Sequence, residues 1–234
     1  MPRTTQPEPA PTGASPPAGR REQRRLAQQD LGRAQLLDAA EEVFGRKGFH
    51  DTTLREIAEL AEFSVGSVYS FFQSKEDLYL SVFLRRGAEF VPGMQAAVAA
   101  GGTPLEQLHR LVDFEVGFFR AHPAFGRLYL RSAGTLPPAL EPTDSEALSE
   151  RFHTAMAIQA DVFARGQAAG ELRDGDPAVL SRLFSGLVSA YQAMDPAVLD
   201  DAPDAPERLP LAELHEIVEA AFARPSGRRS GRGR

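Results

Sequence analysis

Residues 53–75 hold two short helical patterns that only a few residues separate, and this spacing restricts the fold more than any other part of the chain. The first pattern repeats small or apolar residues on one helical face: Ile57, Ala58 and Ala61. Thr53 and Glu56 have the spacing of a capping box, which predicts that this helix begins after Thr53. Helices this short bury little surface alone, so we expect a third helix, over residues 29–47, to pack against them.

The second pattern follows Ser64, a residue type that favours a helix N-cap. Its expected inner face consists of Val65, Val68, Tyr69 and Phe72, and its outward positions are small and uncharged: Gly66, Ser67 and Ser70. Such a pair can form a helix-turn-helix, whose second helix lies in the DNA major groove. By periodicity alone, an ordinary antiparallel helix pair in an all-helical core explains the pattern equally well.

Residues 53–78 resemble the DNA-binding signature of the TetR family of transcriptional regulators. The family's usual positions are occupied here by Thr53, Ile57, Ala58, Ala61, Ser64, Gly66, Tyr69, Phe72, Ser74, Lys75, Glu76 and Leu78. The sequence departs from the family pattern at Glu62 and Phe63, where Gly-Val is common, and at Phe71, where many members carry Tyr or His. The resemblance covers most of residues 28–223 and is specific in the first third.

The resemblance implies an all-α fold, with an N-terminal three-helix helix-turn-helix domain at residues 26–74. A helical domain that binds an effector and dimerises is expected at residues 75–223. Residues 1–25 and the basic residues 224–234 contain few apolar side chains and are expected to be disordered tails. The implied function is a ligand-responsive transcriptional regulator, most often a repressor in this family. An all-helical protein-interaction module that has lost DNA binding or ligand sensing is the alternative.

Charge is distributed unevenly along the chain, whose net charge is −6. Residues 1–80 carry 10 basic and 12 acidic side chains, residues 81–223 carry 11 and 20, and residues 224–234 carry five Arg and no acid. A basic DNA-binding face on the first domain therefore requires some of its acids to point away from DNA: Asp38, Glu41 and Glu42. Two groups of arginines either lie along DNA or only keep the tails soluble: Arg20, Arg21, Arg24 and Arg25, and Arg228, Arg229, Arg232 and Arg234.

Contacts with double-stranded operator DNA are expected from the helix-turn-helix. Thr53 and Lys75 begin helices and should bind phosphates, and the hydroxyl of Tyr69 should do the same. Arg55 is the long cation of the first short helix that can reach a guanine edge, and Gln73 is the local amide. The remaining expected contacts are small residues that permit close approach: Ser64, Gly66, Ser67 and Ser70.

The chain beyond residue 74 has a purely helical pattern that Gly and Pro interrupt. Helices are expected at residues 75–90, 104–122, 124–133, 145–169, 177–194 and 211–223, with loops at residues 136–144 and 195–210. Pro92 and Gly93 are expected to end the first of these helices.

Aromatic and Met side chains recur across three consecutive helices and are joined by a few polar groups. The expected effector contacts are Phe114, Phe118, His122, Phe125, Tyr129, Arg131, Phe152, His153, Met156 and Phe163. Each apolar member could be ordinary core, but together they suit a pocket for a small, mainly apolar effector. If that ligand carries a carboxylate, Arg131 is its expected partner.

The last two helices are the expected homodimer interface. Small residues recur on one of them, Ser181, Ser185, Gly186 and Ser189, and apolar residues on the other, Leu211, Leu214, Val218, Ala221 and Phe222. Either stripe could instead pack within one subunit.

No metal, cofactor or catalytic activity is expected. The chain has no Cys, and its His residues lack metal-ligand spacing. The pairs His109–Asp113 and His215–Glu219 resemble surface ion pairs more than catalytic groups. No apolar run reaches the roughly 20 residues that a membrane span needs, so we expect a soluble, cytoplasmic protein.

Overall fold

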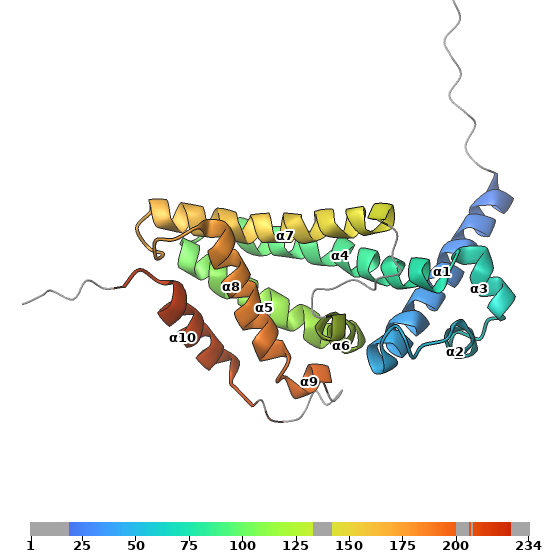
Figure 1. Ribbon diagram of the computed structural model, residues 1–234. Coiled ribbons are helices and arrows are strands. Elements are labelled where there is room, and N and C mark those ends of the chain that lie inside the picture. The colour runs from blue at the N-terminus through green and yellow to red at the C-terminus, as the bar shows by residue number, and fades with distance from the viewer. Residues whose placement is uncertain (1–18, 133–141, 200–205, 207, 226–234) are drawn as a thin grey trace, which may run out of the picture.

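The computed structural model describes residues 19–132, 142–199, 206 and 208–225, which form ten helices and no strand. The helices are α1 (Arg20–Lys47), α2 (Leu54–Leu60), α3 (Val65–Phe71), α4 (Lys75–Ala99), α5 (Pro104–Ala121), α6 (Pro123–Ser132), α7 (Pro142–Ala168), α8 (Pro177–Gln192), α9 (Pro196–Leu199) and α10 (Leu211–Phe222). The predicted all-α fold is confirmed. Helices α1 to α3 lie at one end of the molecule, and α10 lies toward the other (Figure 1).

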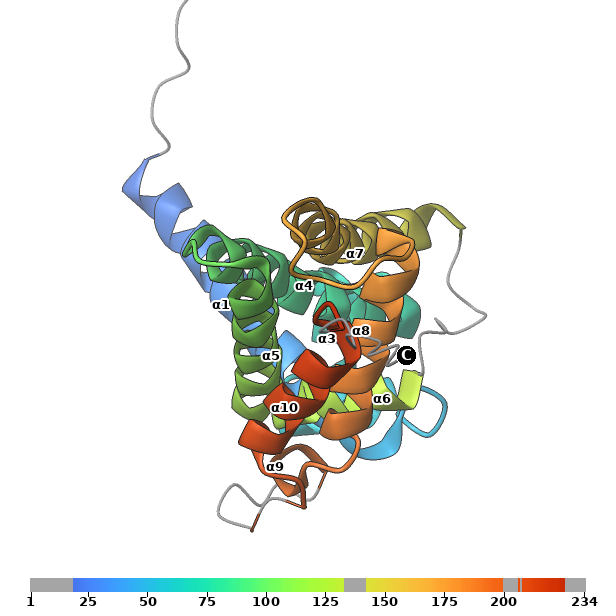
Figure 2. The same ribbon diagram turned by 90° about the vertical axis from the view of Figure 1, so that its left-hand side faces the viewer.

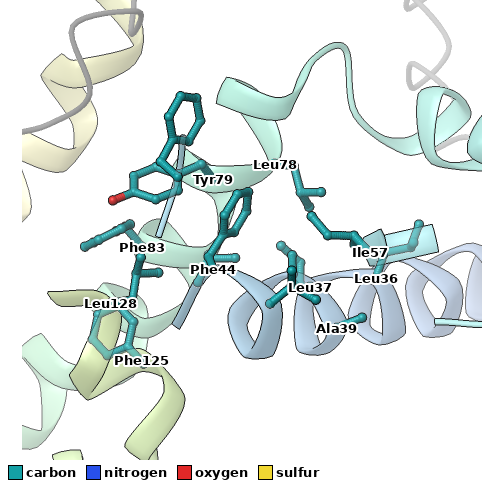
Figure 3. Close-up of a cluster of buried hydrophobic side chains, with 14 of the residues drawn as sticks. Leu36, Leu37, Ala39, Phe44, Ile57, Leu78, Tyr79, Phe83, Phe125 and Leu128 are labelled. Atoms are coloured by element: carbon teal, nitrogen blue, oxygen red, sulfur yellow. The ribbon is translucent and has the colours of Figure 1, made fainter. Parts of the chain in front are cut away.

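The apolar face of α1 organises the core at the first end. Leu36 and Phe44 are fully buried there, together with Ile57 of α2 and Val68 of α3. The same cluster continues along α4 and into α6, where its members are Leu78, Tyr79, Phe83, Phe125 and Leu128 (Figure 3). The predicted domain boundary between residues 74 and 75 therefore crosses a continuous hydrophobic core.

The remaining helices form the body of the molecule around a second buried cluster. Helix α7 lies along α4 and also packs against α5 and α8, which lie on the same side of α7 as α4 (Figures 1 and 2). The largest side chains of this cluster include Met94, Leu111, Phe163, Phe184 and Phe222. The body thus depends on contacts between helices that are far apart in the sequence.

Helix α1 begins at Arg20, nine residues before its predicted start, so residues 20–25 are helical and not part of a disordered tail. Arg25 donates hydrogen bonds to Glu22 at 3.0 Å and to Gln29 at 3.2 Å. Pairs spaced three or four residues apart stabilise an exposed helix. Residues 1–18 and 226–234, with the C-terminal arginines named above, lie outside the described residues.

Helix α4 does not end at Pro92 and Gly93 as predicted but continues to Ala99. A proline inside a helix costs about 3 kcal/mol because a hydrogen bond is lost. Packing offsets this cost: Met94 is fully buried, and the absence of a side chain at Gly93 lets the ring of Phe114 approach closely. Tertiary contacts therefore outweigh the local signal.

Two other parts of the chain differ from the predictions. Helix α7 begins at Pro142, not at residue 145, and the predicted loop residues 136–141 lie outside the described part of the chain. Helix α9 lies in the region predicted as the loop of residues 195–210. Asp195 caps α9 because its carboxylate accepts a hydrogen bond from the Ala197 amide at 3.0 Å.

Four of the nine residues predicted to form the dimer interface are buried inside the subunit, which corrects the assignment for those four. On α8, Ser181 is buried, and the hydroxyl of Ser185 donates to Gln159 of α7 at 2.7 Å. On α10, three of the predicted apolar residues are buried: Leu214, Val218 and Phe222. The large apolar side chains that these two helices expose are instead Val179, Leu183 and Ile217, and Met194 is exposed just beyond the end of α8.

Candidate functional site

The two short helices begin at the side-chain caps that the sequence predicts. The Thr53 hydroxyl accepts a hydrogen bond from the Glu56 amide at 3.3 Å, and the Glu56 carboxylate accepts one from the Thr53 amide at 3.0 Å. Hydrogen bonds from Lys47 of α1 and from Thr53 lower the pKa of Glu56 to about 2. The Ser64 hydroxyl accepts from the Ser67 amide at 3.0 Å. These caps set the directions of α2 and α3.

The turn between α2 and α3 keeps a left-handed residue without a glycine. Glu62, which stands where the TetR pattern commonly has Gly, has φ 60°. This conformation costs a residue with a side chain roughly 1–2 kcal/mol. A hydrogen bond from the Phe63 amide to the Ala58 carbonyl, at 2.8 Å, closes the turn. The departure at this position therefore leaves the helix-turn-helix geometry intact.

Helix α3 presents a small, polar surface to solvent. Gly66 and Ser70 are exposed, and a Cβ at Gly66 would meet nothing closer than the Ser64 hydroxyl at 3.8 Å. Tyr69 is 57% exposed and Val65 is 37% exposed, so the predicted inner face is only partly correct. The buried members of that face are Val68 and Phe72.

The two cations next to α2 and α3 differ in how exposed they are and in how many hydrogen bonds they already make within the protein. The Arg55 side chain is 80% exposed, and its Nε donates to Glu59 at 2.8 Å. Lys75 is partly buried, and its ammonium donates to the carbonyls of Phe49 at 2.9 Å and Thr52 at 3.0 Å. Two of its three N–H groups are thus used inside the protein. Gln73 is exposed, and its backbone amide donates to Asp77 at 2.8 Å, whereas its side chain has no hydrogen-bond partner among the described residues.

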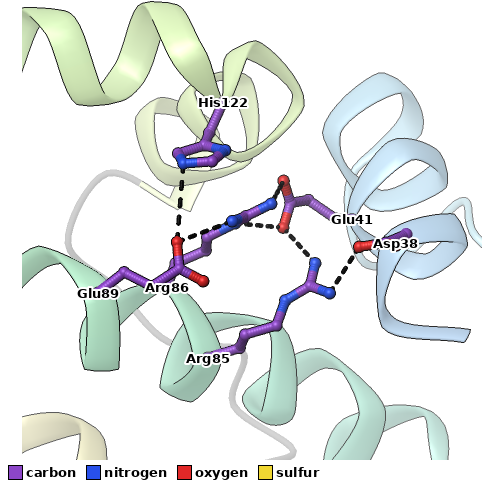
Figure 4. Close-up of polar contacts among 6 residues, drawn as sticks. All are labelled: Asp38, Glu41, Arg85, Arg86, Glu89 and His122. Atoms are coloured by element: carbon purple, nitrogen blue, oxygen red, sulfur yellow. Dashed lines mark hydrogen bonds and ion pairs between the residues drawn. The ribbon is translucent and has the colours of Figure 1, made fainter. Parts of the chain in front are cut away.

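The three acids of α1 that needed to point away from DNA face α4 and α6. Arg85 of α4 pairs with Asp38 at 2.6 Å and with Glu41 at 2.8 Å. Arg86 holds both oxygens of the buried Glu41, at 2.8 and 2.9 Å, and also pairs with Glu89 at 2.9 Å (Figure 4). The third acid, Glu42, approaches Arg127 of α6 at 4.0 Å. An ion-pair network therefore joins α1 to the body.

A cavity of about 110 Å³ lies in the body between α4, α5, α6, α7 and α8. Its apolar lining consists of Phe83, Gly87, Phe90, Val91, Phe119, Phe125, Tyr129, Leu148, Phe152, Ala155 and Met156. An engineered apolar cavity of roughly 150 Å³ binds benzene, so the enclosed space here suits a group of about that size. A larger molecule has to extend through the mouth or move the surrounding helices apart.

Four of the ten residues expected to contact a ligand line this cavity: Phe125, Tyr129, Phe152 and Met156. Phe163 is fully buried and packs on Phe184 and Phe222 in the second core cluster. The ring of Phe90 contacts Phe114 in a tilted arrangement and Phe118 edge to face, and His122 contacts Glu89 at 3.7 Å. Arg131 and His153 are exposed and do not contribute to the lining.

Sequence reasoning missed the polar part of the lining, which consists of Arg86, Glu115, Arg151, Gln159, Ser185, Ser189 and Gln192. These residues come from α4, α5, α7 and α8, and none of them belongs to a recognisable local motif. The helical period of α7 was the available signal, because Phe152, Met156 and Gln159 share one of its faces. Three ionisable side chains, Arg86, Glu115 and Arg151, thus join the mainly apolar lining that the sequence predicts.

Glu115 is the most unusual group of the cavity wall. It is 6% exposed, and the amide of Gln159 donates to its Oε1 at 2.9 Å. Burial raises the pKa of Glu115 to about 8, although the hydrogen bond from Gln159 acts in the opposite direction. The carboxyl group is therefore mainly protonated at neutral pH, when it can donate a hydrogen bond.

The histidines predicted not to be catalytic form a contact between helices. His215 of α10 meets Asp113 of α5 at 2.8 Å, and the rings of His109 and His215 lie 4.7 Å apart. Among the described residues, no group of His, Cys, Asp or Glu is arranged to hold a metal ion. No helix in the described ranges is both long and apolar enough to cross a lipid bilayer.

Comparison with known proteins agrees with this architecture. Residues 36–82 match the model of bacterial regulatory proteins of the tetR family, and residues 104–198 match that of the tetracyclin repressor-like C-terminal domain. The transcriptional repressor NicS of Pseudomonas putida is 29% identical over 150 residues, which are 64% of this chain and 70% of NicS.

Two solved structures share the fold. FadR of Bacillus subtilis, in complex with stearoyl-CoA, has a TM-score of 0.65 at 20% identity and covers 80% of this chain and 95% of its own. AibR, in complex with isovaleryl coenzyme A and operator DNA, has a TM-score of 0.67 at 18% identity and covers 81% of this chain and 97% of its own. Because the two family models together span more than half of its residues, the chain belongs to the TetR family of transcriptional regulators.

Proposed function

We propose that the protein is a homodimeric repressor that binds operator DNA through α2 and α3 and is released by a small effector in the cavity. The exposed, small and polar surface of α3 supports DNA binding, because it permits close approach to a base-pair edge. The proposed DNA contacts are Thr53, Arg55, Ser64, Gly66, Ser67, Tyr69, Ser70, Gln73 and Lys75. Regulators of this family are transcription factors and not enzymes.

The proposed effector has an apolar body and an anionic end. Six aromatic rings line the cavity, which favours an apolar body. Arg151 lies in the lining, and among the described side chains none pairs with its guanidinium. It therefore takes the role first assigned to Arg131. FadR and AibR were solved with acyl-CoA molecules, which combine an apolar chain with an anionic part and support this choice.

The position of Arg86 is the main observation that supports this proposal, because Arg86 connects the cavity with the helix-turn-helix. Its side chain lines the cavity, while its guanidinium holds both carboxylate oxygens of Glu41 on α1. An effector larger than the enclosed space that does not extend through the mouth must displace the surrounding helices, and a displacement of α4 moves Arg86. Binding energy can then favour one position of α1 to α3 over another, by the difference in the effector's affinity for the two states.

The test measures effector binding and operator binding together. The probes are straight-chain fatty acids and their CoA thioesters, and the DNA is the region flanking the protein's own gene. A binding probe should raise Tm and weaken operator affinity by about 5–150-fold, the usual range of allosteric coupling. If no probe changes either quantity, the cavity is not an effector site.

The variant Arg86→Lys keeps a positive charge beside Glu41 but cannot form two parallel hydrogen bonds. It should still bind the probe, whereas the loss of operator affinity should fall below about threefold. Arg165→Lys is the matched control, because Arg165 pairs with Asp161 and Gln107 and does not line the cavity. Equal coupling in both variants would contradict the role of Arg86.

The alternative of a protein-interaction module makes a different prediction for the same DNA. A gel-shift experiment would then show no retardation, with or without a probe. The apolar side chains exposed on α8 and α10, led by Leu183, would in that case bind another protein. We propose instead that they bind a second copy of this chain, because one helix-turn-helix reads too few base pairs and two must act together.

A further inference from the structure

We infer that the effector carries an uncharged hydrogen-bond acceptor, a ketone or other carbonyl oxygen, at the end that meets Glu115. This inference rests on the proposed function, because it concerns the same cavity and the same effector. It adds the chemical group that the inner wall selects.

The first argument is the arrangement of hydrogen bonds around Glu115. Gln159 donates from its amide nitrogen to Oε1 of Glu115 at 2.9 Å and accepts from the Ser185 hydroxyl at 2.7 Å. Gln192 reaches only the backbone carbonyl of Glu115, at 3.5 Å. Among the described side chains, none bonds to Oε2 of Glu115, so this atom is left for whatever fills the cavity.

The second argument is the charge around this carboxyl group. Each helix packed against it contributes to its surroundings: Arg86 from α4, Tyr129 from α6, Arg151 and Gln159 from α7, and Ser185, Ser189 and Gln192 from α8. Arg86 is paired with Glu41 and Glu89, and no described cation bonds to Glu115. Because the buried carboxyl group keeps its proton at neutral pH, it offers a donor and needs an acceptor.

The third argument is the distance between the two polar ends of the cavity. Arg151 and Gln159 are eight residues apart on α7, which is ~12 Å along a helix. Between them the same face carries Phe152, Ala155 and Met156. A ligand that fits this wall is therefore an elongated apolar acid whose anionic end meets Arg151 and whose carbonyl group meets Glu115. A ligand cation at Glu115 would have to share the cavity with both arginines.

The experiment compares matched acids by titration calorimetry at pH 6.5 and pH 9. Decanoate is the reference, and 9-oxodecanoate adds a ketone at the far end of the chain. At pH 6.5 the ketone should improve the Kd roughly three- to tenfold, the value of a net hydrogen bond. At pH 9, above the Glu115 pKa of about 8, the carboxylate cannot donate and this advantage should disappear.

Two substitutions separate this role from a structural one. Glu115→Gln retains an N–H donor that does not titrate, so the preference for the ketone should remain at both pH values. Glu115→Leu removes the donor, so the two acids should bind equally while decanoate still binds. A merely structural Glu115 would change the binding of both acids together.

The outcomes also separate this inference from the proposed function. If neither acid binds and the CoA thioesters also fail to bind, both the effector site and the inference fail; if only the thioesters bind, the inference alone fails. If both bind with equal affinity at pH 6.5, only the inference fails. If 10-aminodecanoate binds more tightly at pH 9 than at pH 6.5, Glu115 recognises cations and the inference is overturned.

Discussion

Substitutions of Lys75 and Arg55 should distinguish a contribution to folding stability from a contribution to DNA recognition. Lys75 combines two hydrogen bonds to backbone carbonyls with a position 4.3 Å from the centre of the Phe49 ring. We predict that Lys75→Met costs about 1–3 kcal/mol of folding free energy, because two buried carbonyls lose a charged donor. A thermal melt should show a clear fall in Tm. An unchanged Tm would mean that the ammonium is available mainly for phosphate.

Arg55→Ala is the matched comparison, because Arg55 is exposed and its pair with Glu59 contributes little to stability. We predict an unchanged Tm and a loss of about 1–3 kcal/mol of operator binding, confined to one base pair. Anisotropy titrations against single-base operator variants measure this effect. Uniform weakening across all variants would assign Arg55 to phosphate and not to a base.

Individual caps were predictable from the sequence because they depend on residues three positions apart. Thr53 and Ser64 form the expected hydrogen bonds. Exposure was less predictable: Tyr69 was assigned to an inner face, but α3 is so short that only Val68 and Phe72 reach the core. The role of Glu115 was not predictable, since its burial depends on Gln159 and Gln192, which are distant in the sequence.

Gly93, where the sequence predicted the end of α4, instead lies inside the helix and allows α5 to pack closely against it. A Cβ at Gly93 would lie 2.2 Å from the ring of Phe114, so α4 and α5 are close at this point. We predict that Gly93→Ala lowers the unfolding free energy by about 1–3 kcal/mol, because either the ring or a helix must shift. Denaturant titration measures the change.

Gly117 on α5 provides the control, since nothing lies within 4 Å of a Cβ at that position. Gly117→Ala should stabilise the protein by about 0.5–1 kcal/mol through helix propensity. The two substitutions thus have opposite expected signs. Stabilisation by both would show that α4 and α5 do not pack closely at Gly93.

Helix boundaries were predictable where they depend on local signals and wrong where tertiary packing decides. Helices α4 and α8 begin at residues 75 and 177 as predicted, because the side chains of Ser74 and Asp176 each accept a backbone hydrogen bond there. Pro92 does not end α4, because Met94 beyond it is fully buried against neighbouring helices. A single sequence contains the cost of the proline but not the contacts that offset it.

The composition of the cavity arises only when five helices come together. Phe125 and Met156 were expected in its wall, whereas Phe163 lies in a separate core cluster. Helical periodicity identifies which residues face inward but not which inward residues surround an unfilled space. The same limit explains why residues of both predicted dimer stripes proved to be buried within the subunit.

The arrangement of the subunits is the remaining determinant of DNA binding, because two helix-turn-helix units must lie about one DNA turn apart. On α8, Leu183 is 59% exposed and Val179 is 53% exposed, and the adjacent Gly186 has no neighbour within 4 Å of a Cβ. On α10, Ile217 is 40% exposed.

We predict that Leu183→Arg produces monomers, because it places two like charges in the symmetric interface between the copies. Light scattering at micromolar concentration should give half the parent mass, and operator affinity should fall with it. Leu31→Arg is the control, since Leu31 is 61% exposed on α1, a helix at the opposite end of the molecule from α10 (Figure 1). A parent protein that is already monomeric, or a dimer that survives Leu183→Arg, would place the second copy elsewhere.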